Sequence, residues 1–363
     1  MASFNDVVNI IAGAIARRVL PGATIEVGRA GGVLWSHAAG RLTYDPDAPA
    51  TRDDTIFDLA SLTKVIATAT LAMRATDEER LDLESPLTEC FAGWRGEDRA
   101  IVTVRDLLAH SAGLTAYLPF FRDHTGRTEF ERAICTLPLE YEPRSGSIYS
   151  DLGFILLGFL LEDVSGASTS GPRNPGATLA SQFGRLAASF TSEPLTFNPP
   201  REWRPNTAPT EIDAWRGRLL VGEVHDENAW ALGGAAGHAG LFGTAAAVGG
   251  FARAVLRTLA GEPLLAGPAT MRMFARKSDV PGSTRALGWD TMLPTSSCGT
   301  RLSPASIGHT GFTGTSLWID PERDLYVVLL TNRVHPTREG EGIHELRRAV
   351  HDAVAQTVPM VAR

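Results

Sequence analysis

The stretch SIGHTGFTGTSLWIDPERDLYVVLLTNR, residues 306–333, decides the fold. It contains three runs rich in β-branched and aromatic residues, near 306–311, 314–320 and 325–332. The sequence DPERD between the last two runs is typical of a tight turn. Strands that are joined by short connections pair in the antiparallel direction. The stretch therefore predicts an antiparallel sheet near the end of the chain.

The remaining elements follow from periodicity and from turn residues. A hairpin is predicted near the N-terminus, with strands at 23–28 and 33–39 and a turn at Gly31-Gly32. Apolar residues at helical spacing, with capping residues before them and glycines after them, predict helices. These cover an N-terminal segment, about 61–76, a short helix that follows Thr103 and is ended by Gly113, 151–165, 245–260 and 341–357. Residues 172–209 hold seven of the 22 prolines and are predicted to be mostly loop.

This order of elements predicts an α/β (α+β) fold. A mainly antiparallel sheet is flanked by the N- and C-terminal helices, and a mostly helical subdomain is inserted into it. We expect residues 1–76 and 240–363 to form the sheet subdomain and residues 77–239 to form the helical, loop-rich one. A chain of 363 residues is long enough for two such units. The cleft between them is the expected place for an active site.

Composition excludes several classes of function. The net charge is −7 and no stripe of Lys or Arg stands out, so we expect no nucleic-acid partner. Cys90, Cys135 and Cys298 lie far apart, which indicates neither a disulfide framework nor a zinc site. The most apolar run, residues 152–161, is too short to cross a bilayer, and the N-terminus is amphipathic rather than signal-like. We therefore expect a cytoplasmic protein with no membrane partner and no cofactor.

The chemistry-bearing residues begin with Ser61 and Lys64. The chain contains only two lysines against 32 arginines, and one of the two lies three residues after a serine in an apolar helix. Residues i and i+3 of a helix share a face, with Cβ atoms about 5–6 Å apart. A buried lysine amine beside a serine hydroxyl can activate that hydroxyl as a nucleophile. An exposed lysine on a surface helix is the plainer interpretation of the same spacing.

Two further motifs follow Ser61-x-x-Lys64 in the chain. They are Tyr149-Ser-Asp151, directly before a predicted helix, and His309-Thr310-Gly311, at the end of a predicted strand. This order resembles the three motifs of the serine β-lactamase and penicillin-binding-protein superfamily. The tyrosine and the histidine resemble its class C β-lactamase-like branch, which includes DD-peptidases, D-aminopeptidases, esterases and acyltransferases. HSAGL (110–114) also resembles a motif of that branch. The segments 208–211, 215–242 and 329–336 resemble a bacterial subgroup that includes cell-wall-recycling amidases acting on muropeptides.

The resemblance implies a β-lactamase-like fold and a role for each motif residue. Ser61 would be the acylated nucleophile, Lys64 its activator, and Tyr149 the group that moves the proton. The backbone N–H groups of Ser61 and Phe312 would form the oxyanion hole. The resemblance also implies that His309 orients Tyr149 or binds the substrate, and it places supporting positions at Asp151, Thr310 and Gly311. Arg333, at the end of the last predicted strand, is a further candidate for binding the substrate.

Two positions depart from the pattern of the superfamily. Asp151 stands where asparagine is common, and a carboxylate close to Lys64 would favour the charged ammonium and leave the role of base to Tyr149. Asp151 is alternatively the N-cap of the helix that follows it. His309 replaces a lysine and is mostly neutral near pH 7, so we do not expect efficient hydrolysis of β-lactams.

Other candidate functional residues also have simpler structural interpretations. His225, Asp226, Glu227 and His238 do not have the spacing of a known metal motif, so lining the cleft is favoured over binding a metal. Arg333 either binds a substrate carboxylate or forms a surface salt bridge. His110 is expected to satisfy local backbone groups rather than to take part in catalysis. The tryptophans at 203, 215 and 230 either form the floor of the cleft or pack against neighbouring loops.

The sequence thus predicts a serine hydrolase that forms an acyl-enzyme on Ser61. The expected partner is a small-molecule or peptide acyl donor with an amide or ester bond, with a D-amino-acid or peptidoglycan-derived peptide as the first choice by resemblance. Two alternatives remain open. One is an acyltransferase that passes the acyl group to an amine or alcohol, and the other is a catalytically silent binding protein on the same fold.

Overall fold

The computed structural model describes residues 3–166 and 177–360. Its centre is a six-stranded sheet in which every neighbouring pair is antiparallel, in the order β2-β1-β11-β10-β9-β8. The strands are β1 (Gly22–Arg29), β2 (Gly32–Gly40), β8 (Asp290–Thr291), β9 (Ile307–Thr310), β10 (Ser316–Asp320) and β11 (Leu325–Thr331). The three strands predicted within 306–333 are therefore present. They lie beside the N-terminal hairpin because β11 pairs with β1, with Ile25 opposite Leu329.

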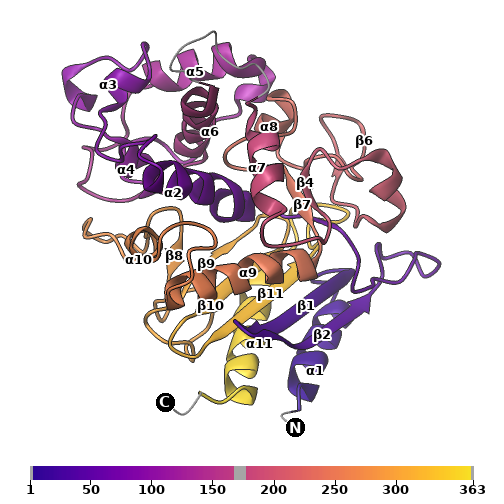
Figure 1. Cartoon of the computed structure of the whole chain (residues 1–363). Helices are drawn as coiled ribbons and strands as arrows, with labels where there is room; N and C mark the ends of the chain where they lie inside the picture. The colour runs from indigo at the N-terminus through magenta and orange to yellow at the C-terminus, as the bar shows by residue number, and fades with distance from the viewer. Residues whose placement is uncertain (1–2, 167–176, 361–363) are drawn as a thin grey trace.

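Helices cover both faces of this sheet (Figure 1). The terminal helices α1 (Asn5–Ala16) and α11 (Ile343–Thr357) lie together on one face, and α9 (Ala245–Ala260) lies on the other. Side chains alternate along β11 accordingly: Val327 and Leu329 join the core beneath α1 and α11, whereas Val328 and Leu330 join the core that contains α9. The antiparallel α/β architecture that the sequence predicts is thus confirmed.

The second layer of the molecule is mostly helical and lies above the sheet in Figure 1. A π-helical turn η1 (Lys64–Ala69) continues into α2 (Thr70–Asp77), and both pack against α6 (Asp151–Gly166). The remaining helices are α3 (Leu87–Cys90), α4 (Val104–Leu108), α5 (Gly126–Thr136), α7 (Leu179–Ala187), α8 (Glu227–Ala231) and α10 (Pro268–Ala275), with 3-10 turns η2 (Glu97–Arg99), η3 (Phe120–Arg122) and η4 (Arg201–Asn206). Short strands complete it: β3 (Phe57–Asp58), β7 (Leu241–Gly243) and β4 (Leu195–Phe197) form one sheet, and β5 (Ile212–Asp213) and β6 (Arg218–Leu219) another.

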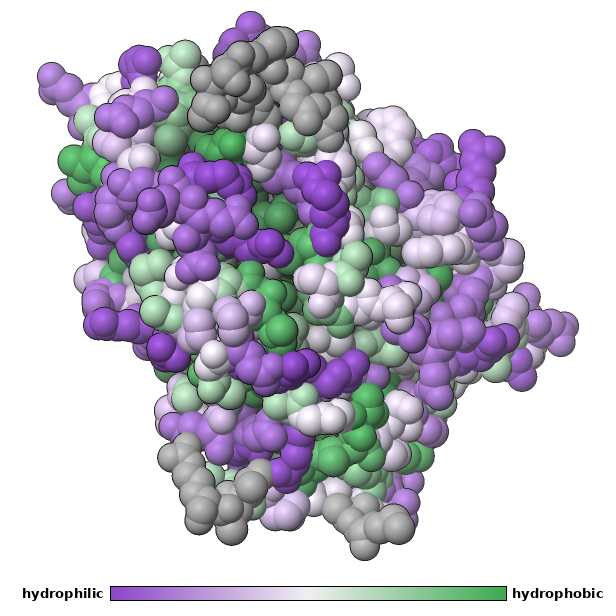
Figure 2. All heavy atoms as spheres, in the orientation of Figure 1, coloured by the Kyte–Doolittle hydropathy of each residue, from purple (hydrophilic) through white to green (hydrophobic). Residues whose placement is uncertain are grey.

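The face seen in Figure 2 is mainly hydrophilic, with apolar residues appearing in small groups between polar ones. Within the described ranges, no helix has both the length and the apolar character that a membrane span requires. The apolar helix α6 is instead buried between neighbouring helices, and its leucines at 152, 156 and 157 are 0% exposed.

Three local expectations are corrected by the structure. Arg29 pairs with Gly32, so the hairpin turn is Ala30-Gly31, one residue earlier than predicted. The short helix α4 ends at Leu108, well before Gly113, because His110 takes a left-handed conformation with φ of 56°. Within the segment 172–209, predicted to be mostly loop, the described residues 177–209 lie for more than half in helices and a short strand. Residues 167–176 lie outside the described part, but α7, η4 and β4 occupy much of the remainder, and the Thr178 hydroxyl caps α7 by accepting from the Ser181 N–H.

Candidate active site

Ser61 follows a strained turn that connects β3 to the helical segment containing η1. Ala60, the preceding residue, has φ of 47°, a conformation that costs an alanine about 1–2 kcal/mol. The buried carboxylate of Asp58 holds this turn, because it accepts from the Ala60 N–H at 2.8 Å and from the His225 N–H at 2.7 Å. The strain is thus offset by hydrogen bonds that fix where Ser61 begins its helix.

Lys64 is completely buried and donates three hydrogen bonds. Its Nζ lies 3.0 Å from the Ser61 Oγ, 2.7 Å from the Asp151 Oδ1 and 3.1 Å from the carbonyl oxygen of His238. An ammonium has three N–H donors and no acceptor, so these three contacts use every proton that it carries. The structure therefore brings Ser61, Lys64 and Asp151 into one hydrogen-bonded group, as the spacing and the resemblance predict.

The charges around Lys64 decide its protonation. Burial lowers the pKa of Lys64, but Asp151 and the Tyr149 phenol raise it, and the net pKa lies above its ordinary value. Lys64 is therefore an ammonium at neutral pH, with no lone pair to take a proton from Ser61. Asp151 is not the cap of α6, because the Ser150 Oγ fills that position by accepting from the Gly153 N–H at 3.4 Å.

Tyr149 lies over the same ammonium. The Lys64 Nζ is 4.8 Å from the centroid of the phenol ring, and the Tyr149 hydroxyl is buried with no hydrogen-bond partner among the described residues. Burial raises the pKa of Tyr149 and the charge of Lys64 opposes that rise, with a net increase above the ordinary value. At neutral pH both candidate bases thus hold their protons, and one of them must release a proton before it can accept that of Ser61.

His309 lies beside Tyr149 at the end of β9, with ring centroids 5.7 Å apart. Its Nδ1 is 2.8 Å from the carbonyl oxygen of Thr310. Burial lowers the pKa of His309 well below its ordinary value, and the charges of Arg285 and Lys64 lower it further. His309 is therefore neutral, as expected from a histidine that replaces a lysine.

The backbone N–H groups of Ser61 and Phe312 make no hydrogen bond to any described residue, which is what an oxyanion hole requires. Two threonines hold the chain segments that carry them in register. The Thr313 hydroxyl donates to the Asp58 carbonyl at 2.8 Å, and the Thr315 hydroxyl donates to the Leu59 carbonyl at 3.0 Å. A Cβ on Gly311 would lie 2.6 Å from the Leu59 carbonyl, so only glycine allows this approach.

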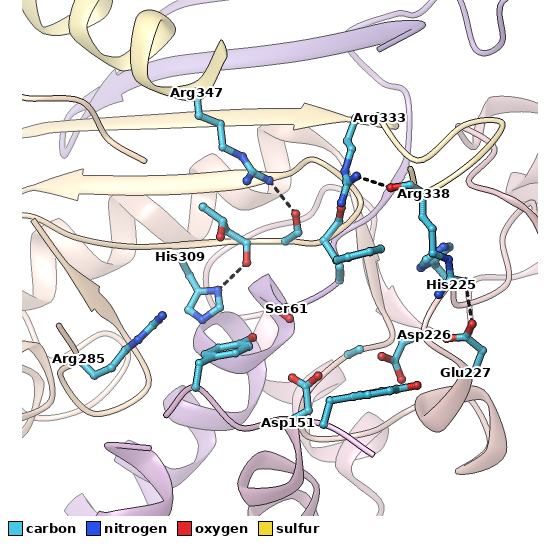
Figure 3. Close-up of a pocket in the computed structure, with 17 residues that line it drawn as sticks. Ser61, Asp151, His225, Asp226, Glu227, Arg285, His309, Arg333, Arg338 and Arg347 are labelled. Atoms are coloured by element: carbon cyan, nitrogen blue, oxygen red, sulfur yellow. Dashed lines mark hydrogen bonds and ion pairs between the residues drawn. The ribbon is translucent and has the colours of Figure 1, made fainter. Parts of the chain in front are cut away.

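These groups line a cavity of about 600 Å³ (Figure 3). The wall on the side of the sheet carries three arginines, Arg285, Arg333 and Arg347, and no carboxylate of the described residues pairs with any of them. The guanidinium of Arg285 lies 4.9 Å from the centroid of the Tyr149 ring, and that of Arg333 lies 4.6 Å from the Phe312 ring. Arg347 donates to the carbonyls of Gly311 and Thr315; burial lowers its pKa to about 9, which leaves it charged at pH 7.

His225, Asp226 and Glu227 also line the cavity (Figure 3). Each has a protein partner: His225 contacts Glu211 at 2.9 Å, Asp226 contacts His238 at 2.8 Å, and Glu227 accepts from Arg338 at 2.7 Å. In the part of the chain that the structure describes, no three potential metal ligands come together. Of the four residues for which the sequence favours lining the cleft, the structure thus places these three on its wall, whereas His238 does not line it.

The sequence did not point to Arg285, Arg347, Tyr117 or Arg338, all of which line the cavity. A signal for Arg347 exists, because it is a charged residue on the apolar face of α11, next to Leu346 and one turn before Val350. Arg285 lies in a loop without periodicity, and only the fold brings it to Tyr149. Thr310 and Gly311 line the cavity as expected, whereas none of the three tryptophans does; Trp215 and Trp230 pack edge to face at 5.3 Å instead.

Comparison with known proteins shows which family the chain resembles. A family model described as Beta-lactamase matches residues 7–352. A Salmonella gallinarum protein named "Putative D-alanyl-D-alanine carboxypeptidase" is 31% identical over 310 residues, covering 78% of this chain and 70% of that protein. Counterparts in Salmonella paratyphi B and Salmonella newport carry the same name and show the same identity and coverage.

Solved structures share the fold at low sequence identity. EstCE1, described as a hydrolase with promiscuous acyltransferase activity, has a TM-score of 0.74 and 22% identity, covering 97% of this chain and 98% of that one. A class C β-lactamase has a TM-score of 0.75 and 16% identity, with 97% of both chains covered. The unliganded simvastatin synthase LovD from Aspergillus terreus has a TM-score of 0.72 and 19% identity, covering 97% of this chain and 98% of that one. With the family model spanning almost all of its residues and a relative above 30% identity, this chain belongs to the Beta-lactamase family.

Proposed function

We propose that this protein is a serine hydrolase that forms an acyl-enzyme on Ser61. The observation that carries the proposal is the contact between the Ser61 Oγ and the buried Lys64 ammonium, in a cavity where two backbone N–H groups are free. A hydroxyl that accepts from an ammonium is held in one orientation, and its own proton remains available for transfer. The free N–H groups of Ser61 and Phe312 are suited to bind the oxyanion of a tetrahedral intermediate.

The proposed reaction follows from this arrangement. Proton loss from the coupled Tyr149 and Lys64 pair leaves a base that takes the proton of Ser61 while its Oγ attacks the scissile carbonyl. The same pair then gives that proton to the leaving amine or alcohol as the bond to it breaks. Water attacks the ester on Ser61 by the same route in reverse and releases the acid. No step requires a cofactor or a metal.

Arg285, Arg333 and Arg347, which have no acidic partner in the described part of the chain, favour a substrate that carries a carboxylate. Charge-assisted hydrogen bonds from guanidinium groups are strong and specific for carboxylates. Of the three, Arg347 is buried, and a buried cation without a counter-ion is costly until a ligand supplies one. His309, which is neutral, is not needed for this recognition. The name of the Salmonella relatives supports the same class of substrate, so we propose a peptide that ends in a D-amino acid as the acyl donor.

Two other functions have observations in their favour. An acyltransferase is favoured by the volume of the cavity, which exceeds that of a small acyl group, and by the name of one structural neighbour, EstCE1. A catalytically silent binding protein is favoured by the ion pair of Lys64 with Asp151, which holds the ammonium in its charged form. A cytoplasmic location stays a prediction from the sequence.

Intact-mass spectrometry over a panel of donors separates these functions. The panel contains a muropeptide, a D-alanyl peptide, a p-nitrophenyl ester and a penicillin, each with and without an added amine, and Ser61→Ala is the control. A hydrolase gives an adduct that water removes, and a transferase gives one that only the amine removes quickly. A wild-type protein that is never acylated by any donor or by a fluorophosphonate would contradict the proposal and leave the silent alternative.

A further inference from the structure

His110 is a buried residue that the proposed reaction does not use, although its ring lies against that of Tyr149. The two ring centroids are 4.8 Å apart, and the imidazole is only 2% exposed. The residue follows Ala109, the C-cap of α4, and has φ of 56°. Its backbone is held there on both sides, because its N–H donates to the Leu107 carbonyl at 3.2 Å and its carbonyl accepts from the Tyr141 hydroxyl at 2.9 Å.

The protonation of His110 follows from its partner. Its Nδ1 lies 3.0 Å from the backbone nitrogen of Ser150, and a backbone N–H can only donate, so Nδ1 carries no proton. Burial lowers the pKa of His110 well below its ordinary value, and the charges of Arg285 and Lys64 lower it further. The ring is therefore neutral and carries its proton on Nε2.

His309 also lies beside the Tyr149 ring, and its imidazole has the opposite tautomer. The Thr310 carbonyl that contacts its Nδ1 can only accept, so Nδ1 carries the proton and Nε2 is a free acceptor. Two neutral histidines thus contact the Tyr149 ring, each fixed by one backbone group. The Nε2 atoms of both are buried without a partner among the described residues.

Ser150 is the residue through which His110 acts on the site. It lies between Tyr149 and Asp151, and its other contacts are the Thr115 carbonyl, which accepts from its hydroxyl at 2.7 Å, and the Gly153 N–H. The N–H of Asp151 donates to the Ala116 carbonyl at 2.9 Å. The hydrogen bond to His110 is therefore the contact that fixes the peptide group between Tyr149 and Ser150.

We propose that His110 is a positioning residue for acylation. By accepting from the Ser150 N–H and packing on the phenol ring, it holds Tyr149 and Asp151 in place around Lys64. The proposal rests on the function proposed above, since the group that it positions is the one that moves the proton. Without the acceptor, the Ser150 peptide group can rotate and the phenol loses its alignment with Ser61.

A matched pair of variants tests this role. His110→Asn keeps an acceptor on the same atom, because the Asn Oδ1 and the His Nδ1 are both bonded to Cγ, and asparagine tolerates a positive φ. His110→Gly tolerates the same φ but has no acceptor, and both variants lack the ring. We expect His110→Asn to keep the rate of acylation within about fivefold of wild type and His110→Gly to lose about 10- to 100-fold in kcat with little change in KM.

Two measurements keep this test independent of activity. Hydrogen–deuterium exchange of a peptide covering residues 147–153 should show one additional fast amide in His110→Gly and none in His110→Asn. Nitrogen NMR of the wild-type histidines should show the Nε2–H tautomer for His110 and the Nδ1–H tautomer for His309, whether or not the glycine variant folds. The opposite tautomer at His110, or equal kinetics in the two variants, would overturn the inference. Wild-type protein with the expected exchange but no acylation of Ser61 would instead refute the proposed function alone.

Discussion

Removing the charge of Asp151 tests the ion pair at the centre of the site. In Asp151→Asn the Lys64 ammonium keeps its contacts with the Ser61 Oγ and the His238 carbonyl but loses the only ion-pair partner that it has among the described residues. An unpaired charge at 0% exposure typically costs about 3–5 kcal/mol of folding free energy. The alternative is that Lys64 releases its proton in the folded state.

The free-energy cost of releasing this proton sets an upper limit on the loss of stability in Asp151→Asn and makes that loss depend on pH. The ordinary pKa of lysine here is 10.5, so at pH 7 deprotonation spans 10.5 − 7 = 3.5 pH units. At 1.36 kcal/mol per unit this is about 5 kcal/mol, and at pH 10 it falls to about 1 kcal/mol. In wild type the raised pKa of Lys64 contributes stability that is fully present below 10.5 and is lost only at higher pH. In the variant burial lowers the pKa, so the loss of stability is largest at neutral pH and shrinks toward pH 10.

Urea denaturation of wild type and Asp151→Asn at pH 7 and pH 10, followed by circular dichroism, measures this difference. We expect a loss of about 3–5 kcal/mol at pH 7 that decreases by at least about 2 kcal/mol at pH 10. The control is Lys64→Met with Asp151→Asn, which has no ammonium and should regain stability at pH 7 and lose the pH dependence. An equal loss at both pH values would refute the reasoning that Asp151 holds Lys64 charged.

Three further predictions concern the reaction. Because the pKa values of Lys64 and Tyr149 are both raised, the acylation rate of wild type should increase from pH 7 toward alkaline pH, and this increase should occur at lower pH in Asp151→Asn. Stopped-flow acylation by a p-nitrophenyl ester measures the pH dependence of the rate. A rate that does not change with pH would contradict the assignment of Lys64 and Tyr149 as the base. Tyr149→Phe should slow the same acylation at least about 10²-fold, and a near-normal rate would assign the base to Lys64. Arg285→Ala should lower kcat/KM about 10- to 100-fold for a donor with a free terminal carboxylate and leave its methyl ester unaffected, whereas equal effects on the two donors would exclude carboxylate recognition by Arg285.

The sheet and most helices could be predicted from the sequence because their signals are local. The strands at the end of the chain alternate or are continuously apolar, and Thr244 before an alanine-rich run predicts α9, whose cap the structure confirms with an Ala247 N–H contact at 3.1 Å. Helix α7 was missed because prolines on both sides favoured loop. Its own segment, Leu179–Ala187, contains no proline and is preceded by the capping Thr178.

The residues of the candidate site that belong to the three sequence motifs could be predicted from the sequence. Ser61, Lys64, Tyr149 and His309 could be found because the three motifs have a recognisable order, and the contact of Asp151 with Lys64 followed from the position of the carboxylate in the second motif. The arginines on the sheet side come from a loop and from α11, so no spacing relates them to Ser61. The carbonyl of His238, which completes the contacts of Lys64, is a backbone group and has no signature in side-chain types.

The central claim is that Ser61 becomes acylated, and peptide mapping tests it most directly. Wild type and Ser61→Ala are each incubated with a D-alanyl ester and with a fluorophosphonate, quenched in acid, digested and examined by mass spectrometry. We predict a single adduct on the peptide that contains Ser61 in wild type and none in Ser61→Ala. An adduct on another residue, or one that persists in Ser61→Ala, would contradict the account.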